Sequence, residues 1–154
     1  MPLSLQLPCL FILFLITISL TSSTKDIHDL LPDYGFPRGL IPNAVVSYTI
    51  SSTGDFSVML SHPCYVEFDQ LVYYDKVVKG KMSYGSVTDV SGIQAKKFFI
   101  WVNVNGMTLD SGSNMIEFHV GGLSQKLPAD QFVEIPDCKN KACQHNHTLL
   151  HQTI

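Results

Sequence analysis

The sequence has few charged residues, and the basic ones form no continuous cluster. Lysine and arginine total 10 against 13 aspartate and glutamate residues, so the formal net charge is −3. Nucleic-acid binding needs basic side chains gathered on one face. The densest basic stretch holds Lys76, Lys79 and Lys81 and is interrupted by other residues. The composition therefore predicts no nucleic-acid partner.

Sequence signatures of catalysis are also missing. The segment Gly122–Lys126 begins like the Gly-x-Ser-x-Gly motif of hydrolases but lacks its second glycine. The doublet Gly121–Gly122 is too short for a phosphate-binding loop. No catalytic residue is assigned, and a non-enzymatic function is favoured, although a Ser/His/Asp set can assemble from distant segments.

Long apolar runs are scarce, and the one near the amino terminus is short. It covers Cys9–Leu20, and no charged residue precedes Lys25. A membrane-spanning helix needs about 20 apolar residues, whereas a shorter run followed by small polar residues is typical of a secretory signal peptide. We therefore predict a signal peptide over 1–23, with an uncleaved signal anchor that tethers the protein to a membrane as the alternative.

The residues from 24 to 138 are predicted to form one β domain, followed by a flexible polar tail over 139–154. From Ala44 onward apolar and polar residues alternate, which is the period of half-buried strands. Turn residues separate the short segments, and no long amphipathic helix is found. About nine short strands with one or two short helical turns indicate an all-β, antiparallel barrel or sandwich.

Turn signals locate the expected hairpins. Ser52–Asp55 and Gly121–Gly122 each separate two alternating segments. Asn105–Gly106 is the strongest hairpin signal, because a type I′ turn favours this pair of residues. The segment before it, Gly92–Val104, is predicted to be the longest strand.

Aromatic residues on this long strand are the most suggestive surface feature. The residues assigned to its core face are Phe98, Ile100, Val102 and Val104. Alternation then places Phe99 and Trp101 on the other face, near Lys97. Aromatic rings beside lysines suit a lipid headgroup boundary or the wall of an apolar pocket. A second buried layer over a central strand is the alternative.

Short motifs follow one another in a distinctive order. The series is Tyr34–Pro42, Gly54–Phe56, Pro63–Phe68, Gly80–Gly85, Val90–Gln94, Phe98–Val102, Val120–Gly121, Leu127–Pro128 and Pro136–Cys138. In combination these motifs resemble the plant domain-of-unknown-function family 538, over nearly the whole chain from Ile27 to Cys138.

The resemblance implies a compact β-barrel or sandwich, a plant source and a secretory leader. It therefore implies an extracellular location, in the apoplast or cell wall. The fold of this family has been likened to one half of the bactericidal permeability-increasing, lipid-binding type of protein. Chlorophyll-related hydrolysis and a role in stress have also been suggested. The family provides no agreed catalytic or binding residues, so none is transferred.

Three cysteines follow the predicted leader. Cys64 and Cys138 lie inside the matched region and are the favoured disulfide, with Cys138–Cys143 or a reduced Cys64 as alternatives, because sequence does not fix connectivity. The cysteines and histidines of the tail match no standard zinc template, so neither a metal site nor a cofactor is predicted. Asn146 begins the N-glycosylation sequon and is predicted to carry a glycan.

These features together predict a secreted, monomeric protein that binds a hydrophobic or lipid-like molecule, either inside the barrel or against the Phe99 and Trp101 face. Peripheral contact with a membrane or the cell wall would use the same aromatic face. One alternative is an esterase-like hydrolase of a pigment or lipid ester, which requires a Ser, a His and an acid within hydrogen-bond reach in one cleft. The other is a cell-wall interaction module.

Overall fold

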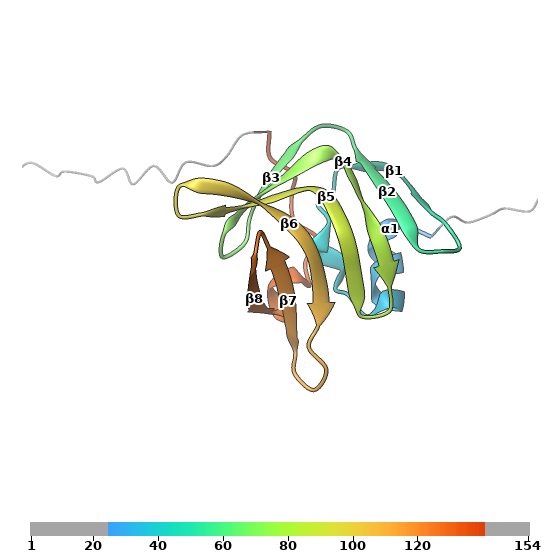
Figure 1. Cartoon of the computed structure of the whole chain (residues 1–154). Coiled ribbons are helices and arrows are strands. Elements are labelled where there is room, and N and C mark those ends of the chain that lie inside the picture. The colour runs from blue at the N-terminus through green and yellow to red at the C-terminus, as the bar shows by residue number, and fades with distance from the viewer. Residues whose placement is uncertain (1–24, 141–154) are drawn as a thin grey trace, which may run out of the picture.

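The computed structural model describes residues 25–140. Eight strands form one antiparallel sheet in the order β1-β2-β4-β5-β6-β7-β8, and β3 pairs with β4. The strands are β1 Val45–Ile50, β2 Asp55–Leu60, β3 Cys64–Glu67, β4 Leu71–Ser83, β5 Ser86–Lys97, β6 Ile100–Leu109, β7 Met115–Val120 and β8 Leu123–Pro128. The sheet curves around its core without closing (Figure 1). The predicted all-β, barrel-like class is confirmed.

The long strands β4, β5 and β6 organise the sheet. One half of β4 pairs with β2 through Val77–Lys81, and its other half pairs with β3 through Leu71–Tyr74. On its β6 side, β7 pairs with the second half of β6 alone, from Val104 onward. The hairpin that joins β5 to β6 therefore extends past the β7–β8 hairpin, and it projects to the left in Figure 1.

Short helical elements fill the hollow of the curved sheet. They are the α-helix α1 Ile27–Leu30 and the 3-10 turns η2 Leu31–Tyr34, η3 Arg38–Leu40 and η4 Ala129–Phe132. The two ends of the described chain meet there, because Asn43 N–H donates to the Pro136 carbonyl over 3.0 Å. The buried apolar side chains from these elements and from the loop between η2 and η3 are Ile27, Leu31, Phe36, Leu40 and Phe132. They close the core that the open sheet alone would leave exposed.

Two of the expected turns are in place and a third is not. The turns at Ser52–Gly54 and Gly121–Gly122 join β1 to β2 and β7 to β8. Asn105–Gly106 instead lies inside β6, so the predicted hairpin there is wrong. The reversal occurs earlier, at Phe98–Phe99, because Lys97 pairs with Ile100.

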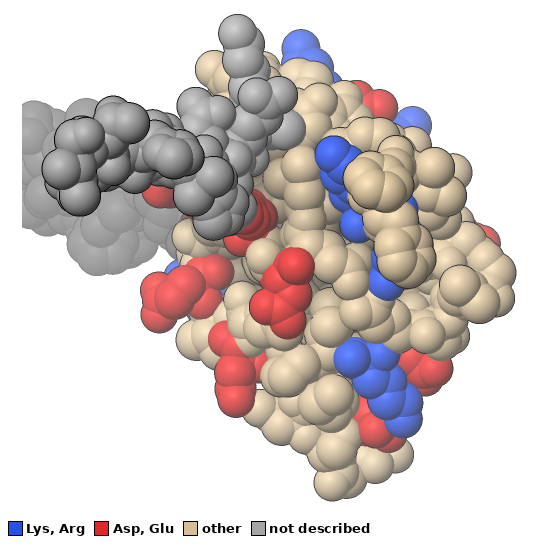
Figure 2. All heavy atoms as spheres, turned by 90° about the vertical axis from the view of Figure 1, so that its left-hand side faces the viewer, with Lys and Arg blue, Asp and Glu red and all other residues tan. Residues whose placement is uncertain are grey.

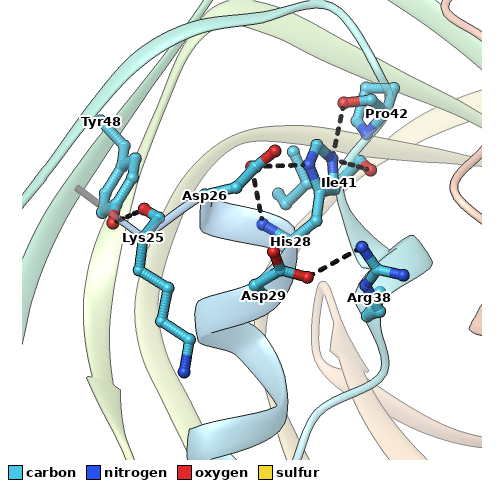
Figure 3. Close-up of polar contacts among 8 residues, drawn as sticks. All are labelled: Lys25, Asp26, His28, Asp29, Arg38, Ile41, Pro42 and Tyr48. Carbon is cyan, nitrogen blue, oxygen red and sulfur yellow. Dashed lines mark hydrogen bonds and ion pairs between the residues drawn. The ribbon is translucent and has the colours of Figure 1, made fainter. Parts of the chain in front are cut away.

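A buried histidine fastens the helical segment to the start of β1. His28 is 5 % exposed, and its Nε2 lies 3.1 Å from the Ile41 carbonyl oxygen and 3.2 Å from that of Pro42 (Figure 3). Carbonyls only accept, so Nε2 carries a proton. Nδ1 faces the Asp26 carboxylate at 3.0 Å. Asp26 also caps α1, since its carboxylate accepts from the His28 backbone N–H.

Replacing Asp26 with alanine is expected to lower the free energy of unfolding by about 1 kcal/mol at pH 7, because the N-cap is lost. The backbone N–H of His28 holds the pKa of Asp26 below its ordinary value of 3.8. The carboxylate therefore stabilises the fold fully at neutral pH, and this contribution disappears as the pH falls through the lowered pKa. Urea denaturation from pH 7 downward should show the two proteins converging below pH 3.8. Asp26→Asn is the control: asparagine still caps, so a loss as large as that of alanine would contradict the capping role.

The predicted terminal segments fall largely outside the described residues. The signal peptide over 1–23, Cys143 and the sequon at Asn146 all lie there, so they remain predictions. The tail was predicted to begin at 139, but Lys139 forms an antiparallel bridge with Tyr65. The β domain therefore includes at least this residue.

Candidate functional site

An apolar cavity of about 60 Å³ lies inside the curve of the sheet. Inward-facing residues of β4, β5, β6, β7 and β8 form its walls, and the helical elements η3 and η4 close it. The lining side chains are Leu40, Phe68, Gln70, Val72, Tyr74, Ile93, Ala95, Val104, Met107, Phe118, Val120, Gln125, Leu127 and Phe132. Twelve of these fourteen residues are apolar or aromatic, so the cavity suits an alkyl chain or ring.

A second apolar cavity of about 40 Å³ lies next to the first. Both cavities are lined by Leu40, Ile93 and Met107, so these side chains form the wall between them. One water molecule needs roughly 10–15 Å³ of such space, so the first cavity has room for a short alkyl group. Methionine is unbranched and adapts readily to its surroundings. A movement of Met107 would join the two cavities into space for a longer chain.

Two glutamine amides lie at the polar rim of the first cavity. Gln70 Nε2, before β4, donates to Gln125 Oε1 on β8 over 3.0 Å. This hydrogen bond spans the open side of the sheet. Beneath it the Phe132 ring lies 4.9 Å from the Phe68 ring and 5.3 Å from the Phe118 ring, measured between centroids. An apolar ligand in the cavity would thus meet an uncharged, hydrogen-bonding rim.

The only ionisable group in the lining, Tyr74, is held neutral. Complete burial raises the pKa of Tyr74 well above its ordinary value of 10.0, and its hydroxyl donates to the Leu40 carbonyl over 2.9 Å. The lining of the first cavity therefore carries no charge across the physiological pH range.

The aromatic residues singled out from the sequence lie around the turn between β5 and β6. Phe99 is 95 % exposed and Trp101 is 38 % exposed, so neither belongs to a second buried layer. Phe98 and Ile100, which were expected on the core face, are 93 % and 64 % exposed because the chain reverses there. Lys97 pairs with Ile100 across the turn.

Behind this turn three rings cluster on the outer face of the sheet. The centroid of the Trp101 ring lies 6.1 Å from that of Tyr65 and 6.3 Å from that of Tyr73. The lysine that reaches this cluster is Lys96, whose Nζ lies 5.9 Å from the Trp101 centroid. Desolvation, followed by the nearby charge of Asp75, raises the pKa of Tyr73. The cluster is therefore a partly dehydrated aromatic surface with a lysine at its edge.

The arrangement required by the esterase alternative is incomplete among residues 25–140. Ser124 Oγ lies 3.1 Å from His119 Nδ1, which is a Ser–His contact that the sequence did not predict. The other ring nitrogen, Nε2, lies 3.2 Å from the Thr108 hydroxyl and not beside a carboxylate. None of these three residues lines either apolar cavity. The contact therefore provides a hydrogen-bonded surface histidine and no support for a hydrolase.

Cys64 and Cys138 form a disulfide with a Cα–Cα distance of 5.0 Å. This is the pairing that the sequence favoured, and it fixes the end of the domain to β3. His62 Nδ1 lies 3.5 Å from Cys138 Sγ. Thiolate and imidazole together are typical metal ligands, but oxidation of both cysteines leaves the imidazole as the one remaining donor of this group. The disulfide is therefore structural.

An incompletely closed, single-sheet β domain with a charge-free interior cavity is an architecture suited to apolar ligands. Comparison with known families identifies this chain: residues 27–133 match the family described as "Protein of unknown function, DUF538". The chain belongs to this family, as its motifs indicated. No curated protein and no solved structure matches it.

Over residues 25–140, no helix is both long enough and apolar enough to cross a membrane.

Proposed function

We propose that this protein is a secreted, non-enzymatic binder of an apolar, lipid-like molecule that enters the cavity between the sheet and Phe132. The observation that carries the proposal is the apolar lining of this cavity beneath an uncharged rim. Natural cores pack with few voids larger than a water molecule, and an apolar void has no folding advantage. Space kept empty in this way favours occupation by a ligand.

The site predicts a ligand with an apolar part and a polar end. Its alkyl or ring part would lie among Val104, Phe118 and Phe132, and each buried methylene would contribute roughly 0.8 kcal/mol. Its polar end would lie at Gln70 and Gln125, which already hydrogen-bond each other. Amides donate and accept hydrogen bonds, so they suit a hydroxyl, ester or carboxyl group better than a bare phosphate.

The test is native mass spectrometry of the purified protein, first as isolated and then titrated with dodecanoic acid. We expect an adduct of one fatty acid per chain, and any co-purified apolar molecule to be released by solvent extraction. The variant Ala95→Leu fills the first cavity, because Ala95 lines it and is 5 % exposed. It is expected to weaken dodecanoic acid binding about ten-fold, since a filled cavity excludes the chain.

The matched control is Val46→Leu, which enlarges a side chain that is 64 % exposed and lines neither apolar cavity. It should retain the adduct, because the first cavity and its rim are unchanged. Circular dichroism checks that both variants are folded. Dodecanoic acid binding that is equal in wild type and folded Ala95→Leu would overturn the assignment of the cavity.

A further inference from the structure

The turn between β5 and β6 presents three large apolar side chains to solvent. Phe98, Phe99 and Ile100, here called the hairpin tip, are 93 %, 95 % and 64 % exposed. Single exposed apolar residues are normal, but a contiguous group at the end of a projecting hairpin is not. Exposed apolar side chains do not stabilise the isolated molecule, so the hairpin tip is a candidate contact surface for a partner.

The backbone of the hairpin tip supports a functional role. Lys97 pairs with Ile100, so Phe98 and Phe99 form a two-residue turn. Phe98 adopts φ of 54°, in the left-handed region. Two-residue hairpin turns normally place glycine or asparagine at such positions, and a bulky residue there is strained. Folding alone would favour a different residue, whereas strained residues cluster at functional sites.

The groups behind the hairpin tip are ordered as they would be across a membrane interface. First comes the apolar tip, then the ring of Trp101 with those of Tyr65 and Tyr73 beside it. Tryptophan and tyrosine are enriched at the headgroup level of bilayers, where one end of the ring is apolar and the other is wet. Lys96 lies over the Trp101 ring.

The charge around the hairpin tip is opposite in sign to that of the whole molecule. Lys96 and Lys97 directly precede the tip, although the chain carries a net charge of −3. Figure 2 views the molecule from the side on which the hairpin projects. It shows basic side chains beside an uncharged, protruding surface right of centre; acidic side chains gather to the left, and others lie at the right edge and lower right. This local basic charge complements an anionic partner.

We propose that the hairpin tip docks the protein on an anionic lipid bilayer. Phe98, Phe99 and Ile100 enter the boundary between headgroups and acyl chains. Lys96 and Lys97 bind the headgroup phosphates. Docking goes beyond the proposed ligand binding and does not need the cavity to be occupied. The two are nevertheless connected, because Val102 and Val104 continue from Ile100 along β6 to the wall of the first cavity.

The test is sedimentation of the protein with vesicles of phosphatidylcholine, with or without phosphatidylserine. The decisive variant is Phe98→Asn with Phe99→Gly, which places asparagine, a residue that tolerates positive φ, at the strained position and removes both rings. Its thermal stability should equal or exceed that of wild type, whereas its partitioning onto the vesicles should fall about a hundred-fold, because two buried aromatic rings are lost. All proteins carry the same amino terminus, so the apolar leader does not contribute to the difference.

Two further readouts and one control variant distinguish specific docking from non-specific adsorption to the vesicles. Lys96→Gln with Lys97→Gln should weaken binding about thirty-fold on the anionic vesicles and leave binding to neutral vesicles unaffected. Trp101 is the one tryptophan in the chain, so its fluorescence should shift to the blue on docking. Leu123→Asn removes another exposed apolar residue, 78 % exposed at the β7–β8 turn, and should change nothing.

Three results would overturn the proposal. The first is equal sedimentation of wild type and the Asn-Gly variant with vesicles. The second is an unshifted Trp101 spectrum in vesicle-bound protein. The third is a wild-type dimer in sedimentation velocity that the Asn-Gly variant dissociates, which would assign the hairpin tip to contact between two copies of this chain. Dodecanoic acid binding that Ala95→Leu leaves unchanged, together with normal sedimentation, would overturn the cavity proposal alone.

Discussion

Replacing both Cys64 and Cys138 with alanine is expected to lower the free energy of unfolding by about 4 kcal/mol. The disulfide joins residues separated by 74 positions, and closing a loop of this length restricts the unfolded chain strongly. Such a loss is a large fraction of the stability of a small domain, which is roughly 5–15 kcal/mol. Urea denaturation of the double variant and of wild type measures it.

The disulfide acts mainly on the unfolded state, because other contacts already hold the same segment in the fold. Asn43 Nδ2 donates to Asp137 Oδ1 over 2.8 Å, and the Cys138 N–H donates to Asn43 Oδ1 over 3.0 Å. We therefore expect the double variant to keep the wild-type circular dichroism spectrum in the absence of denaturant. Reduction of wild type by dithiothreitol should lower its unfolding midpoint to that of the double variant.

Cys143→Ser is the matched control for the alternative pairing of Cys138 with Cys143. It should leave the unfolding midpoint unchanged, because the Cys64–Cys138 disulfide does not use Cys143. If this variant were as unstable as the double variant, or if the double variant lost less than about 1 kcal/mol, the chain-entropy account would be wrong.

Local sequence signals predicted most of the sheet. Ser52–Gly54 and Gly121–Gly122 are turns because flexible residues interrupt an alternating pattern. Both the turn and the alternation can be recognised from residues that are adjacent in the sequence. Alternation also predicted which residues of a strand face the core: Ile116 and Val120 lie on one side of β7, and both are buried. These features depend little on the rest of the chain.

The hairpin wrongly predicted at Asn105–Gly106 shows that local sequence signals do not suffice where a residue is required by a neighbouring strand. Gly106 is required by a neighbouring strand and not by a turn: an added Cβ would lie 2.6 Å from the Val87 carbonyl oxygen of β5. The real turn, at Phe98–Phe99, carries no turn residue at all. Turn prediction relies on glycine, proline, asparagine, aspartate and serine, so it does not detect a turn made of two phenylalanines.

The candidate site also has a part that the sequence predicted and a part that it did not. Phe99 and Trp101 were singled out from alternation along one segment, but the exposure of Phe99 comes from the turn at Phe98–Phe99, which also exposes Phe98 and Ile100. The cavity was not identified residue by residue, because Leu40, Gln70 and Phe132 come from three separate segments. Only the curvature of the sheet brings them together, and curvature arises from bulges and pairing partners that no short window of sequence contains.

Replacing Phe132 with alanine is expected to lower the free energy of unfolding by about 4 kcal/mol and, at the same time, to enlarge the first cavity. Phe132 is 4 % exposed and packs against Phe68 and Phe118. Removal of a buried phenylalanine side chain costs roughly 3–5 kcal/mol when the surroundings do not collapse. The space left has the shape of an aromatic ring at the wall of an apolar cavity, so it should bind benzene.

Measuring the Tm with and without benzene distinguishes an enlarged cavity from a general loss of stability. A ligand that binds only the folded state at about 100 times its Kd stabilises that state by roughly 2.7 kcal/mol, so benzene should raise the Tm of Phe132→Ala, whose cavity is larger, by more than it raises the Tm of wild type. Val133→Ala is the control, since Val133 is 54 % exposed; it should not destabilise the protein, and its response to benzene should equal that of wild type. If Phe132→Ala is too unstable to purify, Phe132→Leu provides the smaller enlargement. Folded variants that gain no benzene response would show that the core collapses around the missing ring, and that the cavity is not a preformed ligand site.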